Sequence, residues 1–111
     1  MRDTMTVFIS TPMSGLTEND IRKNILHAKR WCESVFDAEN KITFFDSLSV
    51  NTDVEDIESA MNLDAYYLGR DICAIAKSNA IVFTDKQWWK YRGCSIEHMV
   101  ADMYQIPIYF M

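Results

Sequence analysis

The 111-residue sequence has few of the residues that break secondary structure, Gly and Pro, or that crosslink a chain, Cys. It contains only 3 Gly and 2 Pro, which leaves no linker, repeat or low-complexity tract. Its 3 Cys lie in separate segments without metal-ligand spacing, and only two His accompany them. The number and spacing of these Cys and His residues exclude a disulfide framework and a zinc site. We therefore expect reduced thiols, a cytoplasmic location, and neither a metal ion nor a cofactor.

Long apolar runs and an excess of positive charge are missing too. Nowhere do 18 apolar residues run together, and polar residues at 10–12 interrupt the N-terminal apolar stretch. We thus expect no signal peptide, no transmembrane helix and no membrane partner. The net charge is −5, whereas a groove for duplex nucleic acid needs clustered Lys and Arg. A small anionic ligand is compatible with this charge, because a few local donors can hold one phosphate.

What is present indicates one soluble α/β domain over residues 1–111, with 49% hydrophobic and 24% charged residues. Four nearly continuous apolar runs predict strands covered on both faces: Thr6–Ser10, Ile42–Asp46, Ala80–Thr84 and Ile106–Met111. Pro107 should place the fourth at a strand end or an edge. Three-to-four-residue periodicity predicts helices between them: Glu18–Phe36, Asp53–Lys77 in two pieces meeting near Asn62–Asp64, and Gly93–Tyr104.

Strand–helix alternation predicts a doubly wound, flavodoxin-like or Rossmann-like parallel sheet in the order 2-1-3-4, with helices on both faces. Ligands of such sheets bind outside the carboxyl ends of the strands where the order reverses, here between the first and third strands. The loop after the first strand has hydroxyls, a glycine and a following helix N-terminus, which can cradle a ribose or phosphate. Its candidates are Ser10, Met13, Ser14 and Gly15. The alternative is a plain strand-to-helix turn.

The loop after the third strand, 85–93, contains three aromatic residues: Trp88, Trp89 and Tyr91. Since such a connection lies at the surface, we expect that they cannot all be core residues. They could form a stacking wall for a planar base or a dimer contact. Gly93 would let the backbone turn into the next helix.

Four carboxylates fall near the expected crevice. Glu97 is expected in the first turn of the last helix, where the helix dipole would favour an ionised nucleophile; alternatively it is a helix-start acid without further role. Asp71 precedes the third strand, and its alternative is a solvent-facing acid paired with a neighbouring cation. Asp46 and Asp85 close the second and third strands and should also point toward the crevice.

In this order, VFISTPMSG, GRDICAIAKSNAIVFTD, W-x-x-x-x-G-x-x-x-E over 88–97 and a final IPIYF resemble the nucleoside 2-deoxyribosyltransferase-like superfamily. The chain is most similar to its short branch, common in bacteria and phages, which has no assigned chemistry. The resemblance implies that Glu97 attacks the anomeric carbon of a nucleoside or nucleotide and that Asp71 positions the sugar. It also implies that Ser10, Ser14 and Gly15 contact ribose or a 5′-phosphate.

Two departures from the family pattern affect the expected reaction. Transferases of the family usually have an aspartate six residues before the nucleophile, where this chain has Tyr91. The sequence also ends within its last strand, without the segment that completes a neighbouring site in the transferases. The resemblance therefore favours hydrolysis of an N-glycosidic bond over base exchange, through a covalent glycosyl intermediate on Glu97.

Two other interpretations stay open from the sequence. One is a non-catalytic module that binds a nucleotide or a nucleotide-derived signal in the same crevice. The other is a small interaction protein that docks through its aromatic loop. We also expect a two-fold dimer, because several Met and Tyr residues exceed what one small core needs: Met61, Tyr66, Tyr67, Met99, Met103 and Tyr104.

Overall fold

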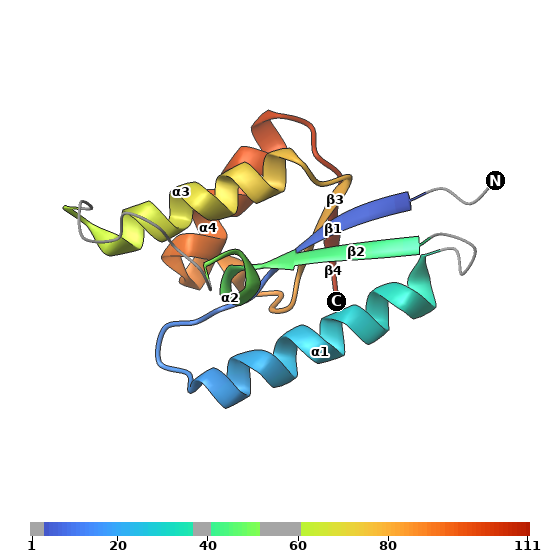
Figure 1. The fold of residues 1–111 in the computed structure, drawn as a ribbon, viewed down its shortest axis with the longest axis horizontal. Helices are drawn as coiled ribbons and strands as arrows, with labels where there is room; N and C mark the ends of the chain where they lie inside the picture. The colour runs from blue at the N-terminus through green and yellow to red at the C-terminus, as the bar shows by residue number, and fades with distance from the viewer. Residues whose placement is uncertain (1–3, 37–40, 52–60) are drawn as a thin grey trace.

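A computed structural model describes residues 4–36, 41–51 and 61–111 of the chain. Its centre is a sheet of four parallel strands in the order β2-β1-β3-β4 (Figure 1). The predicted α/β class and strand order are confirmed. The strands are β1 Thr4–Ser10, β2 Lys41–Asp46, β3 Ala80–Phe83 and β4 Ile108–Phe110.

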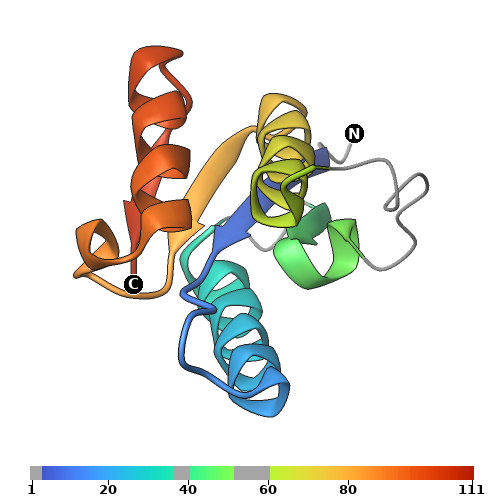
Figure 2. The same cartoon turned by 90° about the vertical axis from the view of Figure 1, so that its left-hand side faces the viewer.

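Helices cover both faces of this sheet, as Figures 1 and 2 show. Helix α1, Glu18–Val35, lies on one face, and α3, Leu63–Ala76, lies with α4, Arg92–Met103, on the other. Side chains of a strand alternate between the two faces. On β1, Val7 and Ile9 pack with the α1 side, whereas Phe8 packs with residues of α3 and α4. Central strands buried on both faces explain the unbroken apolar runs of the sequence.

The helix starts follow from local side-chain caps. Thr17 caps α1 by accepting a hydrogen bond from the Asp20 N–H at 3.1 Å, where the sequence predicted a helix start. Asn62 caps α3 in the same way, at the expected junction. The helical piece predicted to precede this junction falls largely on residues 52–60, which lie outside the described residues.

Two short elements were not predicted: helix α2, Ser47–Val50, and a 3₁₀ turn, η2, at Trp88–Lys90. Strand β4 begins directly after Pro107 and forms one edge of the sheet, as predicted. The Pro107 carbonyl still accepts a hydrogen bond from the Ile81 N–H at 2.9 Å. Among the helices that the structure describes, none is long and apolar enough to cross a membrane.

Candidate functional site

A buried hydrogen bond joins the carboxyl end of β1 to helix α4. Ser10, the last residue of β1, donates from its Oγ to Oε1 of Glu97 at 2.7 Å. Both residues are buried, with 1% of Ser10 and 4% of Glu97 exposed. Ser10 pairs in register with Phe83, the last residue of β3. The bond therefore lies where the strand order reverses, the position at which open α/β sheets bind ligands.

Asp71 of α3 brings a second carboxyl group to the same place. Its side chain is hydrogen-bonded to that of Glu97, and it accepts further hydrogen bonds from Ser47 Oγ at 2.6 Å and from Asn51 Nδ2 at 3.2 Å. Only 5% of Asp71 is exposed, so the alternative of a solvent-facing acid is wrong. The five residues, hereafter the carboxyl cluster, form one continuous chain of hydrogen bonds.

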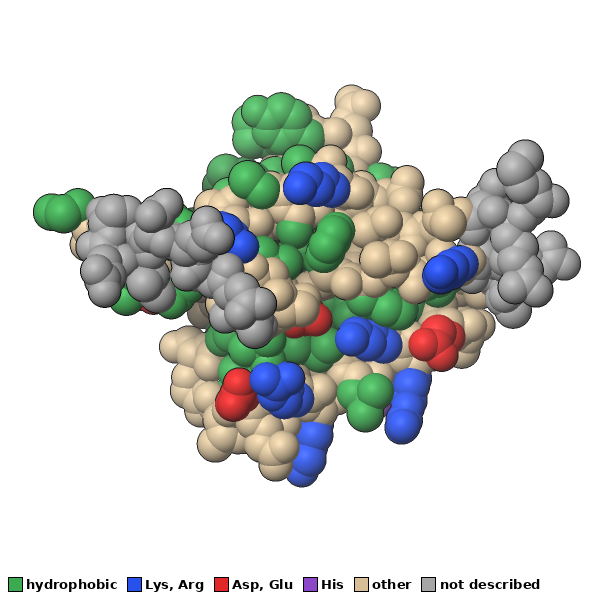
Figure 3. All heavy atoms as spheres, in the orientation of Figure 1, with side chains coloured by type: hydrophobic (Ala, Val, Ile, Leu, Met, Phe, Trp, Pro, Cys, Tyr) green, Lys and Arg blue, Asp and Glu red, His purple; other side chains and the backbone are tan. Residues whose placement is uncertain are grey.

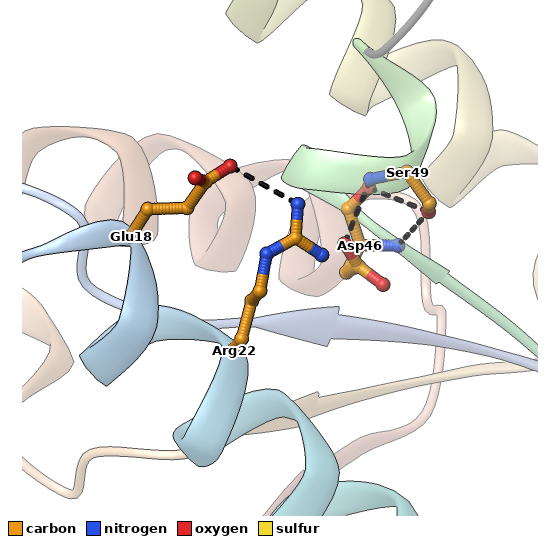
Figure 4. A network of polar contacts seen from close by, with 4 residues as sticks. All are labelled: Glu18, Arg22, Asp46 and Ser49. Atoms are coloured by element: carbon orange, nitrogen blue, oxygen red, sulfur yellow. Dashed lines mark hydrogen bonds and ion pairs between the residues drawn. The ribbon is translucent and has the colours of Figure 1, made fainter.

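Within the described residues, no cation forms an ion pair with the carboxyl cluster. The ion pair present among the described residues joins Arg22 to Glu18 at 3.0 Å on the exposed surface of α1 (Figure 4). Burial, reinforced by the charge and hydrogen bond of Asp71, raises the pKa of Glu97 to about 8 even though the Ser10 hydrogen bond lowers it. Burial also raises the pKa of Asp71, against the hydrogen bonds from Ser47, Glu97 and Asn51 that lower it.

These directions locate one proton on the pair of carboxyl groups. The Glu97 hydrogen bond lowers the pKa of Asp71, whereas the Asp71 hydrogen bond raises the pKa of Glu97. This is the pattern of a protonated Glu97 that donates to an ionised Asp71. Two adjacent carboxyl groups cannot both ionise cheaply in a buried site, so one keeps its proton near neutral pH.

The expectation of a first-turn, dipole-stabilised Glu97 anion is wrong. Helix α4 begins at Arg92 and has no acidic residue in its first turn, so Glu97 lies in the second turn. The dipole effect is largest within the first turn. Desolvation dominates instead and favours the neutral carboxyl group in the unliganded protein.

Asp46 also lies near the cluster, with 5% of its surface exposed, but its carboxylate has a structural use. It accepts a hydrogen bond from the Ser49 N–H at 2.9 Å, and Ser49 Oγ accepts one from the Asp46 N–H at 3.2 Å (Figure 4). This capping box starts α2. The negative charge of Asp46 contributes to the raised pKa of Asp71. Asp85 is half-buried and accepts a hydrogen bond from the Gln87 N–H in its own loop.

Residues 13–15 of the loop after β1 form an exposed turn. Met13, Ser14 and Gly15 are exposed, and the Leu16 N–H donates to the Met13 carbonyl across a tight turn. Gly15 has a φ of +79°, which the third position of a type II turn requires. The expected ribose or phosphate cradle at these three residues stays a prediction.

The expectation that the three aromatic residues cannot all be core residues is confirmed. Trp88 and Tyr91 both pack against the core cluster beneath α3 and α4, while Trp89 is 58% exposed. The indole of Trp88 stacks on the imidazole of His98 with centroids 3.7 Å apart and the planes 5° from parallel. One face of Trp88 is therefore already occupied. Gly93 lies inside α4 and has no positive φ, so the turn assigned to it is wrong.

Comparison of the chain with protein-family models, with curated proteins and with solved structures finds no match. The geometry of the site is therefore the basis for any functional conclusion.

Among the described residues, no group of three or more His, Cys, Asp or Glu side chains is arranged to hold a metal ion.

Sequence reasoning missed two members of the carboxyl cluster and one link beside it. Ser47 and Asn51 follow β2 and supply donors to Asp71. Thr11 is buried and accepts a hydrogen bond from Thr84 Oγ1 at 2.9 Å, which ties the ends of β1 and β3 together. The sequence feature that could have identified Ser47 is its position directly after a predicted strand, because the carboxyl end of that strand borders the crevice.

Proposed function

We propose that this protein hydrolyses the N-glycosidic bond of a nucleoside or nucleoside 5′-monophosphate, with Glu97 as the nucleophile. The observation that supports it most is the pair of hydrogen-bonded, buried carboxyl groups of Asp71 and Glu97 at the strand-order reversal. Burial without a cation costs free energy unless the charge meets a partner. A developing positive charge on a sugar would be such a partner.

The chemistry needs one carboxylate and one proton. As the bond between C1′ and the base nitrogen breaks, the base leaves with the electron pair and takes up a proton, and a Glu97 oxygen forms a bond to C1′. Water then attacks C1′, breaks the ester to Glu97 and leaves the hydroxyl on the sugar, while its proton passes to the carboxyl pair. The transition states resemble an oxocarbenium ion, which an adjacent carboxylate stabilises.

The carboxyl pair can supply both species. In the unliganded protein Glu97 carries the proton, since its pKa is about 8, and Asp71 is its acceptor. Attack requires that this proton leave Glu97, either to Asp71, whose own pKa is also raised, or to the departing base. Ser10 keeps its hydrogen bond to Glu97 in both states, because a hydroxyl can donate to a carboxyl oxygen of either form.

The burial of the pair also favours a second function, binding without turnover. With 4% of Glu97 and 5% of Asp71 exposed, a sugar carbon reaches the nucleophile only if the side chains above it move. A module that binds a nucleotide over this crevice would need no such movement.

Incubation with a panel of ribo- and deoxyribonucleosides and their 5′-monophosphates, with chromatography for free base, tests the proposal. We expect base release from at least one member and its loss, by several orders of magnitude, in Glu97→Gln. The matched control is Asp102→Asn, which removes an exposed acid from the same helix and should keep full activity. Tight binding of a panel member without base release would favour the binding module, and full activity in Glu97→Gln would contradict the assigned nucleophile.

A further inference from the structure

A cavity of about 480 Å³ lies away from the carboxyl cluster, between edge strand β2, helix α2 and helix α3. Its volume is within the range of pockets that bind small molecules. It shares no residue with the carboxyl cluster. The residues that bear on its chemistry are Phe45, Val50, Arg70, Cys73, Ala74 and Lys77.

Different faces of helix α3 contribute to the cavity and to the carboxyl cluster. Arg70, Cys73, Ala74 and Lys77 are spaced three and four residues apart, so they lie along one side of the helix and line the cavity. Asp71 is one residue on, about 100° around the helix, and points its carboxyl group to Glu97 instead. Two cationic side chains, Arg70 and Lys77, therefore line the cavity, while the anionic Asp71 belongs to the carboxyl cluster.

Arg70 is held in place but not fully satisfied. One of its terminal nitrogens, Nη2, donates to the Val50 carbonyl at 2.9 Å, which fixes the plane of the guanidinium group. Its Nε is buried and has no hydrogen-bond partner within the described part of the chain. A buried donor without an acceptor is costly, and such groups are usually satisfied by water, an ion or a ligand. An anionic oxygen in the cavity would form a charge-assisted hydrogen bond with the guanidinium group.

We propose that this cavity binds a small organic anion, with a phosphate or carboxylate on Arg70 and an apolar ring against Phe45 and Val50. Lys77, two helical turns along, adds a second positive charge at the cavity wall. The face of the molecule that carries the β2 edge exposes hydrophobic side chains next to Lys and Arg side chains (Figure 3). This combination selects for a ligand that is both apolar and negatively charged, over either property alone.

Cys73 provides a direct readout of occupancy. It lines the cavity and is exposed, whereas Cys32 and Cys94 are buried. The probe is 1-naphthyl phosphate, compared with neutral 1-naphthol and with inorganic phosphate. We expect 1-naphthyl phosphate to bind by calorimetry and to slow alkylation of Cys73 by iodoacetamide, followed by mass spectrometry, and we expect neither control compound to match it.

Two variants test the cations, with Arg92→Gln, an exposed cation of α4, as the matched control. Arg70→Gln should weaken binding of 1-naphthyl phosphate about tenfold or more, the loss typical of one charged hydrogen bond. Lys77→Gln should weaken it less, and it keeps the test valid if Arg70→Gln does not fold. The proposal is overturned if 1-naphthyl phosphate does not bind, binds without protecting Cys73, or binds no more tightly than 1-naphthol. Unchanged binding in Lys77→Gln and in a folded Arg70→Gln also overturns it.

Discussion

Replacing Glu97 with Gln should stabilise the protein at alkaline pH and leave it nearly unchanged near pH 5. Gln copies the protonated form of Glu97: its carbonyl can accept from Ser10, and its amide can donate to Asp71. The variant thus keeps every hydrogen bond of the neutral side chain. It also removes the possibility of a second negative charge in the carboxyl cluster.

The magnitude follows from the pKa of Glu97, which is about 8 in the folded protein against an ordinary value of 4.5. Between these pH values the unfolded chain releases the proton and the folded chain keeps it, so the stability of the wild type falls as the pH rises. Below 4.5 both states hold the proton, and above about 8 neither does. At about 1.4 kcal/mol per pH unit, the loss reaches at most about 5 kcal/mol.

The assay is urea unfolding of both proteins at several values from pH 5 to pH 9, followed by circular dichroism under reducing conditions. The difference in the free energy of unfolding between Glu97→Gln and the wild type should grow with pH and level off above about pH 8. Carboxyl groups outside the carboxyl cluster cancel in this difference. Asp102→Asn should show no such growth, since its side chain is exposed. A difference that is flat across this range would refute the location of the proton on Glu97.

Three further outcomes are expected. Asp71→Asn should cost roughly 1–3 kcal/mol at pH 6, because Asp71 only accepts hydrogen bonds and an amide would turn a donor toward donors; denaturant unfolding measures this. If the carboxyl pair must carry one proton for base release, kcat/KM should fall as the pH rises above about 8, where Glu97 loses that proton, and a kcat/KM that keeps rising above this pH would contradict the need for the proton. The exposed Met99, Met103 and Tyr104 of α4 predict a dimer mass by light scattering at micromolar concentration, and a monomer mass would contradict this.

The fold was predictable because its signals are local and redundant. The apolar runs around Phe8 and Ile81 belong to central strands buried on both faces, so no polar residue interrupts them. The helices alternate with these strands, and strand–helix alternation leaves few parallel topologies with right-handed crossovers. The two elements that escaped prediction, α2 at Ser47–Val50 and η2 at Trp88–Lys90, are single turns and too short to show a period.

The candidate site was only partly predictable, since its neighbours come from separate segments. Strand-end position and the family resemblance together placed Ser10 and Glu97 around one cleft, and in the structure a hydrogen bond joins them. Nothing local indicates that Ser47 and Asn51 reach Asp71, because α2 that presents Ser47 was itself unseen. The aromatic loop was correctly expected to lie only partly in the core, but its composition does not indicate that Trp88 stacks on His98, ten residues away.

The protonation state of Glu97 was the property of the site least predictable from the sequence. A glutamate near a helix start is ordinarily an anion, and only the combined burial of Glu97 and Asp71 reverses this. Under the proposed chemistry the reversal has a use. A permanently ionised pair would be stabilised by any cation that entered, whereas a pair that holds one proton gains its second negative charge only as positive charge develops on the sugar. The unliganded protein therefore does not carry the second charge, which appears only in the transition state, where a catalytic interaction must be strongest. Stability and turnover should for this reason move in opposite directions in Glu97→Gln.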